Sequence, residues 1–164
     1  MKVFGITGWK NSGKTGLVER LVTELSFRGF TVSTIKHAHH SFDVDYQGRD
    51  SYRHREAGAC EVLLSSGNRW ALMHELRGAD EMSLADLLTK LTPVDVVLVE
   101  GFKTEGHEKL ECHRASTSTM VIGPADDTIV AIASDIELDV ELPFFDLNDT
   151  KVIADFMLTR LGLE

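Results

Sequence analysis

The sequence is poor in residues that cross-link or stiffen a fold. It contains two cysteines, Cys60 and Cys112, and three prolines among 164 residues. The cysteines lie far apart in sequence and the N-terminus lacks an export signal, so we expect a cytoplasmic protein with both thiols reduced. Its charged fraction of 26% and hydrophobic fraction of 43% are ordinary for a globular chain. Disordered and fibrous classes are therefore excluded.

Long apolar runs and an excess of basic residues are also missing. A membrane-spanning helix needs about 20 apolar residues, but the longest candidate, residues 94–99, is short and interrupted by Asp95. Lys and Arg number 17 against 26 acidic residues, giving a formal net charge of -9. Nucleic acids and anionic membranes attract clustered basic side chains, so the composition argues against both. A phosphate ligand would have to be met by a local group of cations.

A phosphate-binding loop is present close to the N-terminus. Residues 8–15 read G-W-K-N-S-G-K-T and match the pattern G-x-x-x-x-G-K-[ST]. Gly8 and Gly13 allow the backbone to curl until successive N–H groups point at a phosphate. Lys14 can reach the β- and γ-phosphates, and the Thr15 hydroxyl can complete a Mg²⁺ shell. The motif predicts nucleoside triphosphate binding.

The segments on either side give the motif the context that it requires. Residues 2–7 are strand-like, and residues 14–28 form an amphipathic pattern with leucines at every fourth position before Gly29. A strand before the loop and a helix after it favour a phosphate site over a chance match, and the helix N-terminus also favours an anion. The predicted nucleotide-binding residues of the loop are Gly8, Lys10, Asn11, Ser12, Gly13, Lys14, Thr15 and Gly16.

The remaining predicted elements alternate between strands and helices, with two neighbouring strands that favour a hairpin. We therefore predict a single domain over residues 1–164 with an α/β fold. It is the three-layer fold of P-loop NTPases, a mostly parallel sheet flanked by helices, with an additional β-hairpin. Further strands are predicted at residues 30–35, 60–64, 70–76, 94–99, 109–113, 120–122, 129–133 and 143–145. Further helices are predicted at residues 49–57, 83–91 and 149–161.

A second nucleotide signal follows the most apolar predicted strand. Residues 94–99 suit a strand buried on both faces, and Glu100 stands at its carboxyl end, where open α/β sheets bind ligands. A strand-end carboxylate near a P-loop hydroxyl commonly lies at the metal. We predict Thr15 and Glu100 as Mg²⁺ ligands and Glu100 also as a catalytic residue. Gly101 would let the backbone approach the γ-phosphate, and Lys103 is either a phosphate contact or a solvated lysine.

Residues 36–45 concentrate three histidines and two aspartates. A transition-metal site needs three or four converging ligands, and neither cysteine lies here, so the pattern favours a polar loop beside the P-loop. Its carboxylates would position Mg²⁺ or the attacking water, which makes Asp45 a catalytic candidate. Asp50 is another catalytic candidate that can also cap the following helix. The residues predicted to contact an anionic second ligand are His37, His39, His40 and Arg49, with Arg53 and Arg114 as further anion-binding candidates.

Together these motifs make the sequence similar to the molybdopterin-guanine dinucleotide biosynthesis protein B (MobB) family. The resemblance implies a GTP-binding protein with slow Mg²⁺-dependent hydrolysis. It also implies a homodimer that assists molybdopterin guanylyltransferase, the enzyme that attaches GMP to molybdopterin, and that itself contacts molybdopterin. By residue, it places Gly13, Lys14 and Thr15 at the phosphates and Mg²⁺, and Glu100 at the metal or its water shell. The resemblance rests on residues 8–15, 36–45, 48–51, 57–59 and 99–103.

Two departures from common nucleotide-binding patterns concern affinity and base selection. Many P-loop proteins have a hydroxyl residue after the Lys-Thr pair that contacts the α-phosphate, whereas this chain has Gly16. The sequence also lacks an N-K-x-D base-reading motif, so guanine selection follows only from the resemblance. Residues 133–135 and 148–149 are the candidate base contacts.

Two other functions are compatible with the same motifs. A metallochaperone GTPase would use histidines of residues 36–45 together with Cys112 and His113 to deliver nickel or zinc. A small-molecule kinase would use the histidine-rich loop to hold a phosphate acceptor. Metal analysis and phosphate transfer to an added metabolite distinguish these functions from an adapter.

Overall fold

The computed structural model describes residues 1–38 and 42–163. Contacts between residues divide the chain into two compact units. The first unit comprises Met1–His37 and Leu84–Glu164, and the second comprises Ala38–Ser83. The single domain predicted over residues 1–164 stays a prediction.

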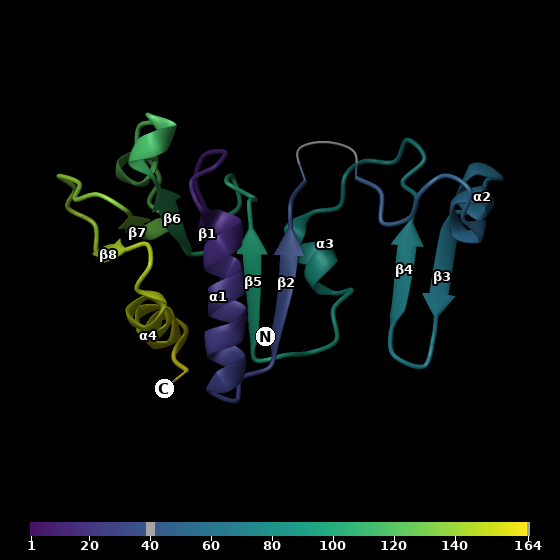
Figure 1. Cartoon of the computed structure of the whole chain (residues 1–164), viewed down its shortest axis with the longest axis horizontal. Helices are drawn as coiled ribbons and strands as arrows, with labels where there is room; N and C mark the ends of the chain where they lie inside the picture. The colour runs from purple at the N-terminus through teal and green to yellow at the C-terminus, as the bar shows by residue number, and fades with distance from the viewer. Residues whose placement is uncertain (39–41, 164) are drawn as a thin grey trace. The chain divides into compact units, whose positions relative to one another are not determined.

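The first unit is built on a six-stranded sheet with the strand order β2-β5-β1-β6-β7-β8. Each pair of neighbouring strands in this sheet is parallel, which confirms the mostly parallel sheet. Parallel strands end at the same edge, so the loops that follow β1, β5 and β2 emerge together (Figure 1). The strands are β1 Lys2–Thr7, β2 Val32–Lys36, β5 Val96–Glu100, β6 Lys109–His113, β7 Ile129–Ser134 and β8 Phe144–Asp146.

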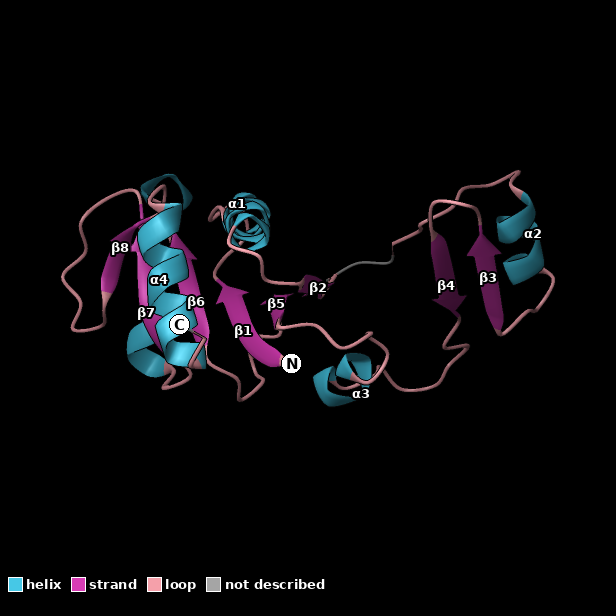
Figure 2. Cartoon of the chain, turned by 90° about the horizontal axis from the view of Figure 1, so that it is seen from below, coloured by secondary structure: helices cyan, strands magenta, loops and turns pink. Residues whose placement is uncertain are grey.

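Helices lie on both faces of this sheet, as Figure 2 shows. Helices α1, Lys14–Phe27, and α4, Thr150–Leu161, lie on one face, and the short helix α3, Leu84–Leu88, lies on the other. The first face holds the larger core, in which strand residues such as Phe4 and Leu98 pack with residues of α1 and α4. The predicted three-layer architecture is confirmed. This arrangement positions the β1–α1 loop at the carboxyl edge of the sheet.

Helix α1 forms where the leucine periodicity predicts it. Leu17, Leu21 and Leu25 are fully buried, because residues four apart share one helix face. The helix stops before Gly29, whose φ of 92° is a left-handed conformation suited to glycine. The N–H of Phe30 then bonds the Leu25 carbonyl at 3.0 Å and closes the helix end.

The second unit contains helix α2, Asp50–Glu56, and a hairpin of β3, Glu61–Ser65, and β4, Trp70–His74. The two strands are antiparallel, with Ser65 opposite Trp70, so the predicted hairpin is confirmed. Arg55 on α2 forms ion pairs with Asp43, Asp45 and Glu75 inside this unit.

Two predicted elements differ from the structure. Residues 120–122 were predicted as a strand but form none. Both edges of the neighbouring β6 are already paired with β1 and β7, and the N–H groups of Ile122 and Gly123 donate to the Glu111 carboxylate instead. Helix α3 ends at Leu88 rather than at residue 91. Single turns follow, in which Leu91 N–H bonds the Leu88 carbonyl.

The prediction that Asp50 caps α2 is wrong. Arg49 occupies the N-cap position, and Asp50 is the first residue of the helix. Its carboxylate lies 3.8 Å from the Arg53 guanidinium one turn later. None of the helices formed by the described residues is both long and apolar enough to cross a membrane.

Candidate functional site

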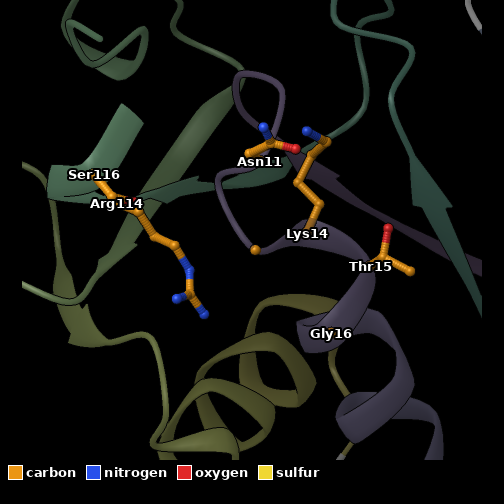
Figure 3. A pocket seen from close by; sticks show the side chains of 7 residues that line it. Asn11, Lys14, Thr15, Gly16, Arg114 and Ser116 are labelled. Atoms are coloured by element: carbon orange, nitrogen blue, oxygen red, sulfur yellow. The ribbon is translucent and has the colours of Figure 1, made fainter. Parts of the chain in front are cut away.

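The P-loop lies between β1 and α1, and its glycines are required by close backbone contacts. Gly8 has a φ of 132°, and a Cβ at this position would lie 2.3 Å from the Cys112 carbonyl oxygen. Gly13, at the N-cap of α1, has a φ of 97°. Both conformations are strained for residues with side chains. The two glycines therefore set the path of the loop that Figure 3 shows around Asn11 and Lys14.

Lys14 lies within the loop. Its Nζ donates to the carbonyls of Gly8 at 3.1 Å and of Trp9 at 2.6 Å. Burial lowers the pKa of the Lys14 ammonium, and the nearby cations Lys36 and Lys103 act in the same direction. An anion bound here would relieve this repulsion.

The strand-end carboxylate meets the P-loop hydroxyl as predicted. Thr15 Oγ1 donates to Glu100 Oε1 at 2.9 Å, and the Glu100 side chain is mostly buried. Lys36 Nζ lies 3.3 Å from the same carboxylate oxygen and 3.4 Å from Thr15 Oγ1. Two hard oxygen donors side by side suit Mg²⁺, and the ammonium of Lys36 shows that a cation is accommodated beside both. Thr15 and Glu100 therefore fit the predicted metal.

Sequence reasoning missed Lys36 as part of this group. Lys36 ends β2 and is in register with Glu100 at the end of β5. The sequence showed only that each of the two residues directly follows a predicted strand. The pairing of those strands is a long-range feature. Its place beside the P-loop follows from the strand order.

The turn after Glu100 has an unusual backbone. Gly101 has a φ of 97°, and a Cβ there would lie 3.0 Å from the His37 Cβ. The next residue, Phe102, has a φ of 48°, a rare conformation for a bulky side chain. The rings of His37 and Phe102 lie 4.8 Å apart, and the His37 N–H bonds the Glu100 carbonyl at 2.9 Å. These contacts hold the segment from Glu100 to Phe102 beside the P-loop.

Lys103 lies beside the Trp9 side chain of the P-loop. Its Nζ lies 4.2 Å from the centre of the Trp9 ring, over the ring face. An ammonium over an indole is a favourable cation–π contact. Lys103 thus stays close to the loop through Trp9, and its role as a phosphate contact stays a prediction.

A pocket of about 400 Å³ opens beside the P-loop and the start of α1. Arg114, directly after β6, extends toward the loop from the opposite wall (Figure 3). Sequence analysis named Arg114 as an anion-binding candidate but missed Ser116 in the same wall. The pocket is lined by Asn11, Gly13, Lys14, Thr15, Gly16, Arg114 and Ser116.

A second pocket of about 400 Å³ shares Asn11 and Ser116 with the first. Its other lining residues are Trp9, Lys10, Thr117 and Thr119. Trp9 is fixed by its indole N–H, which donates to the Met120 carbonyl at 2.8 Å. Lys10 and Asn11 thus border a pocket, whereas Ser12 is buried and its N–H bonds the Trp9 carbonyl at 3.3 Å.

Several predicted site residues lie in the second unit. Asp45 accepts a hydrogen bond from Arg55, which lowers the pKa of the carboxyl group together with a hydrogen bond from Ser51. The Arg49 guanidinium lies over the Tyr46 ring, 4.7 Å from its centre. The catalytic roles of Asp45 and Asp50 and the anion role of Arg49 stay predictions. His39 and His40 lie outside the described residues.

The candidate base contacts have structural partners. The Ser134 hydroxyl is buried against His113 Nδ1 at 3.0 Å, and Asp135 accepts a hydrogen bond from the Ala115 N–H at 2.9 Å. Asp149 is the N-cap of α4, and its carboxylate accepts from the Val152 N–H.

Those residues proposed for metal delivery that the structure describes do not form a cluster, and His39 and His40 lie outside the described part of the chain. Within residues 1–38 and 42–163, no group of three or more His, Cys, Asp or Glu side chains could hold a metal ion. Burial raises the pKa of the Cys112 thiol to about 12, which keeps it protonated at neutral pH. Both ring nitrogens of His113 have hydrogen-bond partners, Ser134 and the Thr119 carbonyl.

The sheet order and the loop between β1 and α1 define the class of this protein as the P-loop NTPase fold. The chain belongs to the MobB family, since the family model described as "Molybdopterin guanine dinucleotide synthesis protein B" matches residues 3–135.

Relatives and solved structures agree with this assignment. The molybdopterin-guanine dinucleotide biosynthesis adapter protein of Haemophilus influenzae is 39% identical over 94% of this chain and 86% of its own. The adapter protein of Escherichia coli is 36% identical over 95% of this chain and 91% of its own. Bacillus subtilis MobB superposes with a TM-score of 0.76 at 24% identity, with each chain fully covered. The MobB homologue of Bacillus stearothermophilus gives 0.72 at 24% identity, also with full coverage, and both structures support the fold.

Proposed function

We propose that this chain is a GTP-binding adapter protein in the synthesis of molybdopterin guanine dinucleotide, with slow Mg²⁺-dependent GTPase activity. Family membership and the names of the two relatives support the adapter role. Nucleotide binding rests on one observation above all. The P-loop hydroxyl of Thr15 bonds the strand-end carboxylate of Glu100 at 2.9 Å, beside the ammonium of Lys36.

The charge distribution supports a phosphate ligand at this site. The whole chain has a formal net charge of -9, yet the pKa of Lys14 is lowered first by burial and then by the nearby charges of Lys103 and Lys36. Arg114 lines the same pocket as Lys14. Glu100 adds a negative charge to this group, but the cations outnumber it, so a polyanion would find complementary charge here. Selection of guanine over adenine follows from the family resemblance.

The site residues have separable roles in hydrolysis. Thr15 and Glu100 would hold Mg²⁺, which neutralises phosphate charge when bound. Lys14 would bind the β- and γ-phosphates, and backbone N–H groups at the start of α1 would complete the cradle. Glu100 would also orient the attacking water. Turnover would be slow, because no described arginine is assigned to the γ-phosphate, where such a residue strongly accelerates hydrolysis.

The proposed partners are molybdopterin guanylyltransferase, molybdopterin and a second copy of this chain. The hairpin of the second unit presents apolar side chains to solvent, which suits a protein contact. These exposed side chains are Leu63, Leu64, Trp70 and Leu72.

Nucleotide binding by Lys14→Ala tests the proposal. Competition against a fluorescent GTP analogue with Mg²⁺ would measure GTP, GDP and ATP affinities, with and without the guanylyltransferase. We expect Lys14→Ala to weaken GTP binding at least about tenfold, because a charge-assisted phosphate contact is lost. Lys90→Ala, which removes an exposed lysine outside the pockets, should bind like the unsubstituted protein.

Unchanged GTP affinity in Lys14→Ala would refute the site assignment. Equal affinity for ATP and GTP would refute guanine selection while leaving nucleotide binding intact.

A further inference from the structure

We propose that Arg114 binds the α-phosphate of the nucleotide, in the place of the side-chain hydroxyl that Gly16 does not provide. This inference rests on the proposed nucleotide binding and adds to it a ligand from outside the P-loop. Arg114 would act within the same chain and on the phosphate nearest the nucleoside. Its contribution would be to affinity rather than to cleavage of the γ-phosphate.

The position of Arg114 follows from strand pairing. β6 is parallel to β1 and hydrogen-bonded to it, so the residue after β6 emerges beside the P-loop. An ideal Cβ on Gly13 would lie 2.9 Å from Arg114 Nε. The guanidinium therefore lies against the first turn of α1, as Figure 3 shows. Gly13 leaves room for it.

The guanidinium has free donor capacity at this place. Arg114 Nε is buried and has no hydrogen-bond partner among the described residues. Arg20, which also borders Gly16, differs because its guanidinium donates to the Leu147 carbonyl at 2.7 Å and to Thr150 Oγ1 at 2.9 Å. Buried donors are normally satisfied. A bound oxyanion in the pocket would meet the guanidinium of Arg114, which lines it.

The pocket extends to the α-phosphate end of the loop. Thr15 Oγ1 points to Glu100 and Lys36, which marks the metal side, where the β- and γ-phosphates bind. Arg114 lines the pocket together with Lys14 and Thr15 and also with Gly16, the position whose hydroxyl contacts the α-phosphate in many P-loop proteins. A planar guanidinium can bind a phosphate through two parallel hydrogen bonds. It can therefore replace one neutral hydroxyl.

Steric need does not explain the glycine at position 16. A Cβ on Gly16 would have Arg20 Nη1 as its nearest neighbour, at 3.6 Å, which is ordinary van der Waals contact. Gly16 has a helical backbone within α1. A serine is thus accommodated, and Gly16→Ser can restore the missing hydroxyl experimentally.

The test compares Arg114→Gln, Gly16→Ser and the double variant, with Arg160→Gln as a control of equal charge change. Arg160 lies in the last turn of α4 and pairs with Glu108 on the surface. Affinities for GDP and GTP would be measured by competition, and circular dichroism would confirm folding. We expect Arg114→Gln to weaken the binding of GDP and of GTP by a similar factor, about ten- to a hundredfold. Arg160→Gln should leave both unchanged.

The double variant makes the assignment specific. In the Arg114→Gln background, Gly16→Ser should raise nucleotide affinity at least about threefold. In the unsubstituted protein the same substitution should raise affinity less, because both groups bind the same phosphate. The inference would be overturned if Arg114→Gln bound GDP and GTP within twofold of the unsubstituted protein. It would also be overturned if Gly16→Ser raised affinity equally in both backgrounds, or if Arg114→Gln weakened the binding of GTP alone. Failure of the unsubstituted protein to bind GTP or GDP would instead refute the proposed function on which the inference rests.

Discussion

At the scale of single residues, His107 is a buried imidazole in an unusual environment. Both of its ring nitrogens are buried without a hydrogen-bond partner among the described residues. Its ring lies over Gly5, where an ideal Cβ would be 2.6 Å from Nε2. The adjacent Lys109 is fully buried, and its ammonium donates to Thr128 Oγ1 at 2.6 Å. Burial, and then the charge of Lys109, lowers the pKa of His107 to about 4.

This shift predicts a loss of stability on acidification. In the unfolded chain His107 has the ordinary pKa of 6.5, so between pH 6.5 and 4 the unfolded state binds a proton that the folded state does not. The contribution of the neutral His107 ring to the free energy of unfolding is therefore fully present above pH 6.5 and is lost as the pH falls toward 4. It amounts to at most about 3 kcal/mol. Urea unfolding from pH 8 to 4.5 of the unsubstituted protein and of His107→Leu measures it.

The difference between the two proteins isolates His107 from its neighbours. Glu111 has a pKa raised by burial, which acts with the opposite sign in part of this range but is common to both proteins. We expect the free energy of unfolding of the unsubstituted protein to fall more steeply below pH 6.5 than that of His107→Leu. Parallel pH profiles would contradict the assignment.

At the scale of elements, helix α4 is defined by its two ends. Asp149 caps the N-terminus through the Val152 N–H at 3.3 Å, and Gly162 follows the last turn with a φ of 65°. Between them Ile153 and Met157 are fully buried against the sheet. The helix lies where the sequence predicted it, Asp149 has a capping role in the structure, and its role as a base contact stays a prediction.

The cap predicts a stability difference between two substitutions. Asp149→Ala should lower the free energy of unfolding by about 1 kcal/mol, because an N–H at the helix start loses its acceptor. Asp149→Asn keeps a capping oxygen and should cost much less. Urea unfolding of both variants checks this expectation, and equal losses would show that the carboxylate charge matters rather than the cap.

At the scale of the whole molecule, the two units differ in how their strands are buried. Val96, Val97, Leu98 and Val99 of β5 are fully buried, and β5 is paired on both sides. The hairpin of the second unit is two-stranded, with Val62 and Met73 as its buried apolar residues. Two-stranded hairpins have little stability of their own.

Hydrogen exchange should therefore separate the units. We expect β5 and β1 amides to exchange at the rate of global unfolding, and hairpin amides at least about a hundredfold faster at low protein concentration. If the exposed apolar side chains of the hairpin contact a second copy in the proposed homodimer, the protection of hairpin amides from exchange should rise with protein concentration. Hairpin amides as protected as those of β5 at the lowest concentration would contradict the difference between the units.

Much of the site was predictable because its signals are local. The P-loop is a run of eight residues, and the glycines and Lys14 act within it. Glu100 was found because an apolar run ends in an acid, and buried parallel strands place such ends at ligand sites. The incorrect strand at residues 120–122 shows the limit. Its three apolar residues favour a strand, but the sequence does not show that both edges of β6 are already paired.

The phosphate-binding loop, the α/β alternation and the family were determined by the sequence itself, because each depends on neighbouring residues or on short periodic patterns. The partners of those residues were decided only by the tertiary structure. Lys36 meets Glu100 because β2 pairs with β5, and Arg114 meets Gly13 because β6 pairs with β1. Strand order is set by packing between distant segments. No local pattern therefore encodes which cations gather around the loop.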